Sequence, residues 1–299
     1  MATAKAKTGT DVAAPLDDGI PLSPLEVAQQ STALSTDVVD LSQLAGMGSE
    51  EVRAQDFSIP FLRILQKGSP EVDESEGKYV PGAKAGDLFN TVTQVFYNGK
   101  TGLKVIPCLF HREYIEWIHR DEGGGFVAAY QADDPIVATA KAPEGERDLK
   151  LPNGHQLIDT YYEYVLCETP EGDVFPAVMS FTSTQVKKIR RWNSMMGQKR
   201  LVLPDGKVLS NPPVFAFYYE VGSVPEKNDQ GSWHGWHIVA TEKPNDRVPD
   251  QMLCEALQFY RQVKSGEAKR APEHDQNDRG ADGGEESIPG FESAQRTFG

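Results

Sequence analysis

The chain has 299 residues and a formal net charge of −14, and 39% of its residues are hydrophobic. This composition is that of a globular protein with one large domain or two small ones, and it excludes a chain that is disordered throughout. No apolar run of roughly 18 residues occurs, and no secretory signal opens the sequence, so we expect a soluble, cytoplasmic protein without a membrane partner.

The acidic side chains are concentrated at the two ends of the chain. Residues 1–50 carry seven acids and two lysines, residues 271–299 carry seven acids and two arginines, and the net charge of residues 51–270 is only −4. Segments rich in charge and poor in large apolar residues rarely fold alone. We therefore predict a disordered arm over residues 1–50, one domain over residues 51–266 and an acidic disordered tail over residues 267–299.

From residue 55 onward the pattern is mainly that of strands joined by turns. We predict strands over residues 87–96, 103–118, 126–130, 161–168, 174–182, 214–222 and 232–242. Pro107 indicates an edge or a bulge, and Asn98-Gly99 indicates a hairpin. The stretches LKLPNGHQL (149–157) and LVLPDGKVL (201–209) each place Pro-Asx-Gly between apolar flanks, which is typical of a surface hairpin.

A helix over residues 249–264 is predicted to close the domain. Its expected apolar face contains Leu253, Leu257, Tyr260 and Val263. The strands before it are separated by tight turns without repeated βαβ spacing. This pattern favours an α+β domain that is predominantly β, built as a barrel or a sandwich.

A second helix is predicted over residues 184–196, where positive charge is most concentrated. Val186, Ile189, Trp192 and Met196 fall on one side, which we expect to be buried with Trp192 as a core anchor. The other side is cationic and the helix has no acid, although solvent-exposed helices usually mix both signs of charge. We therefore predict that an external polyanion supplies the counter-charge. The predicted phosphate-binding residues are Lys187, Lys188, Arg190, Arg191, Lys199 and Arg200.

Aromatic and basic residues elsewhere fit the same kind of partner. Arg112 and Tyr114 are two positions apart on a predicted strand, so they share one face. Trp233 begins a later strand within GSWHGWHIVA. An exposed ring can stack on a base of any sequence. We predict that Arg112, Tyr114 and Trp233 provide stacking and backbone contacts, and core packing is the alternative for each ring.

The three cysteines, Cys108, Cys167 and Cys254, share no short spacing. The sequence therefore predicts neither a disulfide framework nor a CxxC metal or redox site. We expect all three to be reduced and buried.

Motifs of catalysis are missing from the sequence. It contains no GxxxxGK[ST], GxGxxG, HExxH or GxSxG, so we predict a protein that is not an enzyme and that needs no cofactor. His234 and His237 would face opposite sides of a strand, and no metal site is predicted. The carboxylates that leave a metal-dependent nuclease open as an alternative are Asp87, Glu116, Asp121, Glu122, Asp133 and Asp134.

Three stretches resemble single-stranded DNA-binding proteins of bacteriophages and bacteria, namely QDFSIPFLRILQKGSPEV, TSTQVKKIRRWNSMM and GSWHGWHIV. The resemblance spans residues 55–245. It implies an OB-fold core, a five-stranded barrel whose open face binds single strands, here with insertions. It also implies an acidic tail with an apolar tip, and SIPGF is similar to the Ile-Pro-Phe tip of the bacterial proteins with Gly290 inserted. The tip residues implied to bind replication or recombination proteins are Ile288, Pro289 and Phe291.

The sequence thus predicts a non-enzymatic, OB-like protein that coats and protects single-stranded DNA during phage-type replication or recombination. It leaves open whether the protein forms an oligomer. The first alternative is a structural or virion-associated β-rich protein whose basic helix joins subunits. The second is the nuclease. Salt-dependent retention of oligo(dT) separates the first alternative from the prediction, and incubation with labelled strand and Mg²⁺ separates the second.

Overall fold

The structure is a computed structural model that describes residues 44, 46–53, 56–119, 122–143, 149–228, 231–242 and 246–270. The chain divides into two units, Met1–Val52 and Arg53–Gly299. In the first unit, turns are closed by hydrogen bonds from the Met47 N–H to the Leu44 carbonyl and from the Ser49 N–H to the Gly46 carbonyl. Most of the predicted arm and tail, including the tip residues Ile288, Pro289 and Phe291, lies outside the described residues.

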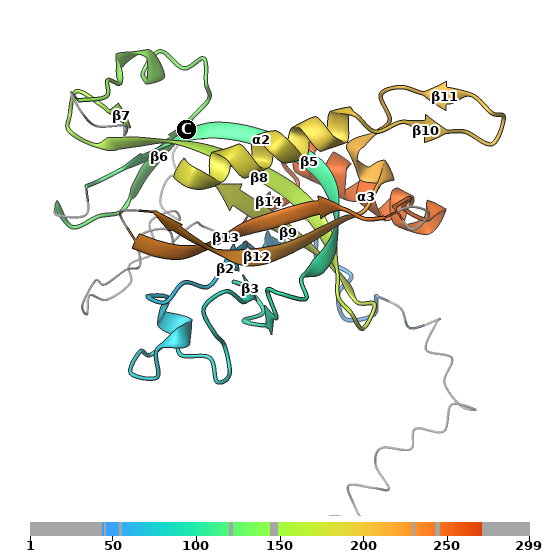
Figure 1. Cartoon of the computed structure of the whole chain (residues 1–299), viewed down its shortest axis with the longest axis horizontal. Coiled ribbons are helices and arrows are strands. Elements are labelled where there is room, and N and C mark those ends of the chain that lie inside the picture. Colours follow the sequence, from blue (N-terminus) through green and yellow to red (C-terminus); the bar gives the residue numbers. More distant parts are fainter. Residues whose placement is uncertain are drawn as a thin grey trace, which may run out of the picture. The chain divides into compact units, whose positions relative to one another are not determined.

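A seven-stranded antiparallel sheet is the main element of the second unit (Figure 1). Its strands are β5 (Leu103–Trp117), β6 (Phe126–Tyr130), β7 (Leu149–Lys150), β8 (Gln156–Glu168), β9 (Val174–Phe181), β12 (Tyr219–Asn228) and β13 (Gly231–Ala240). β5 pairs with β8 along most of its length. β12 and β6 pair with the other edge of β5, and β9 and β7 pair with the other edge of β8. In chain order, β5, β8 and β9 form a meander, and the hairpin of β12 and β13 returns to lie beside the first of these strands.

The long strand β5 is interrupted near Pro107, as predicted. The pairing register with β8 shifts between Pro107 and Leu109. Proline has no N–H to donate to a ladder, and the extra residue of a bulge bends its strand. Figure 1 shows the resulting curvature of β5 and β8. β5 therefore pairs with β12 through its first residues and with β6 through its last.

The basic helix forms where it was predicted, as α2 (Val186–Gly197), which follows β9 in the chain. Ile189 and Trp192 are fully buried, and Val186 and Met196 pack against the same core. Trp192 makes edge contacts with the rings of Phe181 and Tyr219, at centroid distances of 6.5 and 5.6 Å. The predicted apolar stripe and the anchoring role of Trp192 are confirmed.

The C-terminal helix is α3 (Asp250–Ser265), and it ends at Gly266 with a left-handed φ of 77°. Its buried residues are Ala256 and Phe259. Leu253 and Val263 pack against the core as expected, but the buried residues lie one position before the expected Leu257 and Tyr260. This shift of the buried face of α3 leaves Cys254 exposed to solvent.

The expectation of three buried thiols holds for Cys108 and Cys167 and is wrong for Cys254. Cys108 and Cys167 lie on β5 and β8, inside the sheet. Burial raises the pKa of both thiols well above the usual range, so they are uncharged.

Three small sheets complete the described fold. They are β1 (Ser58–Ile59) with β14 (Lys269–Arg270), then β2 (Leu62–Ile64), β3 (Leu88–Asn90) and β4 (Phe96–Tyr97), and finally β10 (Leu201–Val202) with β11 (Val208–Leu209). The hairpins predicted at the two Pro-Asx-Gly turns are confirmed as β7–β8 and β10–β11. The described residues contain two α-helices beside these strands, so the fold is α+β and predominantly β, as predicted.

The parallel pair β1 and β14 brings Ser58–Ile59 beside Lys269–Arg270. Arg270 donates a hydrogen bond to Glu113, and its guanidinium carbon lies 4.3 Å from the centre of the Tyr162 ring. The described fold therefore continues to Arg270.

The predicted hairpin at Asn98-Gly99 is wrong. A turn forms there, and the Asn98 side chain accepts hydrogen bonds from the next backbone N–H groups, but β4 pairs with β3 while β5 pairs with β8 and β12. Glycine is needed at position 99 for another reason. A Cβ at Gly99 would lie 1.8 Å from the Gly86 carbonyl oxygen. Gly99 therefore allows its loop to lie close to the loop that contains Gly86.

Candidate functional site

One face of α2 presents cations without a counter-charge from the described residues. Lys187, Arg190 and Arg191 are exposed, and among the described residues no carboxylate lies within ion-pair distance of them. The helix contains no acid of its own. We name these three residues the cationic face. Neighbouring like charges on a helix repel each other, so this face favours an anionic ligand.

Tyr161 on β8 connects the cationic face to the sheet. The Arg190 guanidinium donates to the Tyr161 hydroxyl at 3.1 Å, and the guanidinium carbons of Arg190 and Arg112 lie 5.8 and 4.9 Å from its ring centre. Arg112 also binds both carboxylate oxygens of Asp159, at 2.7 and 2.8 Å. These hydrogen bonds raise the pKa of Arg112 above its usual range. Arg112 is therefore charged but already paired.

Tyr114 and Phe110 extend the same surface along β5. Arg112 donates to the Tyr114 hydroxyl at 2.9 Å, which confirms that the two side chains share a face. Phe110, two residues earlier, is 42% exposed, and its ring centre lies 6.0 Å from that of Tyr161. Neither Phe110 nor Tyr161 was among the predicted site residues. The alternation of positions 110, 112 and 114 is the signal that could have identified Phe110. We name this group the aromatic patch, and it consists of Phe110, Arg112, Tyr114, Tyr161 and Arg190, of which Tyr161 is buried.

Lys188 and Trp233 are held by one carboxylate on β12. The Lys188 ammonium lies 2.6 Å from Glu226, and the Trp233 indole N–H donates to Glu226 at 3.0 Å. Gln185 also donates to Glu226, at 3.2 Å. Burial opposes ionisation of Glu226, but the hydrogen bonds from Lys188 and Gln185 outweigh it and lower its pKa. Glu226 thus joins the start of α2 to the hairpin of β12 and β13.

Replacing Glu226 by Gln is expected to lower the free energy of unfolding by about 1 kcal/mol, because the ion pair to Lys188 is lost in a partly buried setting. Urea denaturation measures this change. Glu220→Gln, an exposed change on the same strand, is the control and is expected to cost less than about 0.5 kcal/mol. Equal effects of the two changes would contradict the joining role of Glu226.

Lys199 and Arg200 lie beyond the cationic face. The Lys199 ammonium lies 2.9 Å from Asp246 and 4.8 Å from the centre of the Phe217 ring, so it is neutralised in a half-buried position. Arg200 is exposed, and its guanidinium donates to the Gly197 and Lys199 carbonyls at the end of α2. The structure therefore does not bring these two residues to the cationic face.

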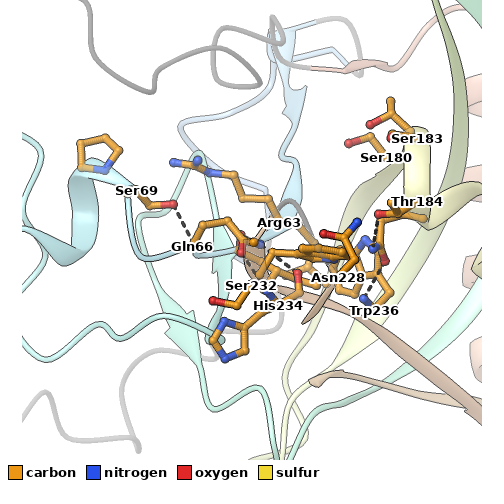
Figure 2. A pocket seen from close by; sticks show the side chains of 18 residues that line it. Arg63, Gln66, Ser69, Ser180, Ser183, Thr184, Asn228, Ser232, His234 and Trp236 are labelled. Atoms are coloured by element: carbon orange, nitrogen blue, oxygen red, sulfur yellow. Dashed lines mark hydrogen bonds between the residues drawn. The ribbon is translucent and has the colours of Figure 1, made fainter. Parts of the chain in front are cut away.

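A pocket of about 550 Å³ lies at the N-terminal end of α2. It is formed by β2 with the turn after it, by the connection from β9 to α2, and by the facing ends of β12 and β13. Figure 2 shows Ser180, Ser183 and Thr184 on one side and Arg63 and Gln66 on the other. Its remaining lining residues include Ser69, Asn228, Ser232, Trp233, His234 and Trp236.

The walls of the pocket are fixed by hydrogen bonds between these segments. The Gln66 amide exchanges two hydrogen bonds with the backbone of His234, at 2.9 and 2.8 Å, as a neighbouring strand would. The Gln185 side chain accepts from the Trp236 N–H at 2.9 Å. The pocket therefore offers hydroxyl, amide and indole groups in fixed positions next to the cationic face.

Glu163 lies buried in the seven-stranded sheet, beside the aromatic patch. It is opposite Phe110 on β5 and Met179 on β9, and its exposure is 0%. Neither carboxyl oxygen has a hydrogen-bond partner among the described residues. Burial raises the pKa of Glu163 to about 8. The side chain is therefore mainly a neutral acid at neutral pH.

The carboxylates considered for a nuclease have separate roles where they are described. Asp87 accepts a hydrogen bond from the Lys84 N–H at 2.9 Å. Glu116 accepts from Tyr130 and Asn153 and lies 2.6 Å from His155. Among the described residues, no group of three or more His, Cys, Asp or Glu side chains is placed to hold a metal ion. In the same part of the chain, no helix has both the length and the apolar character needed to cross a bilayer.

Comparison with known proteins gives one finding. No curated protein and no solved structure matches the chain. The model of the Pam3 phage gp34-like protein family matches residues 29–269. This match includes α2, the aromatic patch and the pocket, and it covers well over half of the sequence. The chain therefore belongs to the Pam3 phage gp34-like protein family.

Proposed function

We propose that this phage-type protein binds single-stranded DNA through the cationic face and the aromatic patch. The observation that carries the proposal is the exposure of Lys187, Arg190 and Arg191 without carboxylate partners among the described residues. Lys188, Lys199 and Arg112 have internal carboxylate partners, so we leave them out of the phosphate-binding set.

An OB-like arrangement of the strands is the second part of the proposal. An OB-fold is a five-stranded, partly open Greek-key barrel. The meander of β5, β8 and β9, followed by α2 and the hairpin of β12 and β13, supports this reading. The order of these strands in the sheet is β13, β12, β5, β8 and β9, and the bulge at Pro107 gives β5 two partners on one edge. β6, β7 and the small sheets are then additions to the barrel.

In this proposal the strand of DNA follows α2 and reaches the pocket. OB-folds bind oligonucleotides on the face of strands 2 and 3, beside the loop between strands 4 and 5. Here that loop is the turn between β12 and β13, whose ends line the pocket. Phosphates would bind the cationic face, and bases would stack on Phe110 or enter the pocket beside Trp233. The pairing of Lys188 and Trp233 with Glu226 keeps the pocket wall in position before the strand arrives.

The test is a titration of fluorescent oligo(dT) at several salt concentrations. The triple change Lys187→Ala, Arg190→Ala, Arg191→Ala is expected to weaken binding. It should also reduce the slope of log affinity against log salt by about 2, because each phosphate contact on a single strand contributes roughly 0.7. The matched control is the exposed triple Lys84→Ala, Lys100→Ala, Arg261→Ala, which should leave the slope within error.

Two outcomes would contradict the proposal. Absence of salt-dependent binding by the unchanged protein would favour the structural or virion-associated role. Equal slopes for the triple variant and the control would show that the phosphates bind elsewhere. Incubation of labelled strand with Mg²⁺ or Mn²⁺ completes the experiment, because cleavage would favour the nuclease.

A further inference from the structure

We propose that copies of this chain associate head to tail, with the hairpin of β10 and β11 from one copy bound to β6 of the next. This inference goes beyond the proposed function, because it concerns contacts between protein copies and requires no nucleic acid. The occupant of both surfaces is a second copy of the chain.

The hairpin of β10 and β11 is an apolar element without a covering layer. Val202 and Val208 are cross-strand partners, and they are 61% and 58% exposed. Among the described residues, the two strands pair only with each other. A two-stranded hairpin alone in water is marginally stable. Contact with another apolar surface would stabilise this one.

β6 provides a surface of matching character. Charged residues and proline usually protect an edge strand from pairing with another chain, and the sequence FVAAY of β6 contains neither. It pairs with β5 and, among the described residues, with no other strand. The register shift at Glu116 and Trp117 leaves Val127 out of this pairing. Phe126 and Val127 are 56% and 42% exposed.

The position of the two surfaces determines the kind of assembly. Figure 1 shows β6 and the hairpin of β10 and β11 on opposite sides of the described part of the second unit. One copy therefore cannot cover its own β6 with its own hairpin. A contact between two different surfaces generates a ring or an open chain of copies, not a symmetric dimer.

The charged residues favour contact between the hairpin and β6 over contact between two hairpins. Arg200 and Lys207 are exposed on either side of the apolar pair in the hairpin, and with the exposed Asp205 of the turn they leave an excess of one positive charge there. Glu122 and Asp133 are exposed on either side of β6. Opposite charges at the rim of an interface guide encounter and fix its register, whereas like charges oppose it. Contact between two hairpins would bring Arg200 and Lys207 of both copies together. Contact between the hairpin and β6 brings these basic residues next to acidic ones.

The test is sedimentation velocity of the full chain without nucleic acid, over a series of concentrations. The unchanged protein is expected to show an average mass that rises with concentration beyond that of a dimer. The hairpin variant Val202→Asp, Val208→Asp and the edge variant Val127→Lys are each expected to remain monomeric. Val92→Asp and Val92→Lys, at a 50% exposed valine in another turn, are the matched controls and should associate normally. Far-UV circular dichroism checks that all variants are folded.

Mixing the two defective variants gives the decisive result. The edge variant keeps an intact hairpin, and the hairpin variant keeps an intact β6, so the equimolar mixture should form dimers and nothing larger. A monomeric unchanged protein, or a mixture that stays monomeric, would overturn the proposal. Association of the edge variant alone would show that the hairpin binds a different surface. Because no DNA is present, these results are separate from the oligo(dT) test.

Discussion

Replacing Glu163 by Gln is expected to remove a loss of stability that the protein otherwise suffers as the pH rises from 4.5 to 8. The pKa of Glu163 is raised by burial from 4.5 to about 8. Between these values the folded protein holds a proton that the unfolded chain has released, so the free energy of unfolding falls as the pH increases. At roughly 1.4 kcal/mol per pKa unit, the total loss is on the order of 5 kcal/mol.

The Gln variant has no proton to lose, so its stability should be nearly constant across this window and exceed that of the unchanged protein at the upper end. Urea denaturation at a series of pH values measures both curves. Glu113, Glu116 and Glu226 do not interfere, because their pKa values are lowered from 4.5 and their contributions are lost only at more acidic pH. Parallel curves for the two proteins between pH 4.5 and 8 would show that Glu163 does not titrate in the fold.

Replacing Trp192 by Ala is expected to cost about 3–5 kcal/mol of stability, the usual range for deletion of a large buried ring. Trp192 is 0% exposed and packs against Phe181 and Tyr219. Its indole N–H has no hydrogen-bond partner among the described residues. Trp192→Phe keeps most of the packing and removes this donor, so the two effects oppose each other and the net change should stay within about 1 kcal/mol.

Thermal or urea unfolding of both variants tests this expectation. Phe57→Ala, at a ring that is 64% exposed, is the control and should change stability by less than about 0.5 kcal/mol. If Trp192→Phe were as destabilising as Trp192→Ala, the indole N–H would make a hydrogen bond that contributes to the stability of the fold. If the Ala variant were as stable as the control, α2 would not be anchored by this ring.

Local features of this fold could be predicted from the sequence because they depend on neighbouring residues. The helical spacing of Val186, Ile189 and Trp192 places one side of α2 in the core. Pro107 has no N–H to donate, so it interrupts the hydrogen bonding of β5 with any partner strand. The same holds for the two Pro-Asx-Gly hairpins. The turn at Asn98-Gly99 is the exception. Its residues form a turn in either context, and only the three-dimensional fold decides whether the flanking strands pair.

The neutralisation of individual cations could not be predicted, because the carboxylates come from distant segments. Lys188 meets Glu226 and Lys199 meets Asp246, across separations of 38 and 47 residues. The sequence around the helix has no acid and so indicates six available charges. The sheet topology then decides which of them point at β12 or at the turn before α3. Lys187 and Lys188 are adjacent in the sequence and differ in the direction they face.

The pairing of β1 with β14 joins two segments that lie far apart in the sequence. Ser58 and Lys269 are partners in this pair, so removing either short strand would leave the backbone N–H and C=O groups of the other without their partners. The two segments must therefore be kept together in any shortened form of the protein.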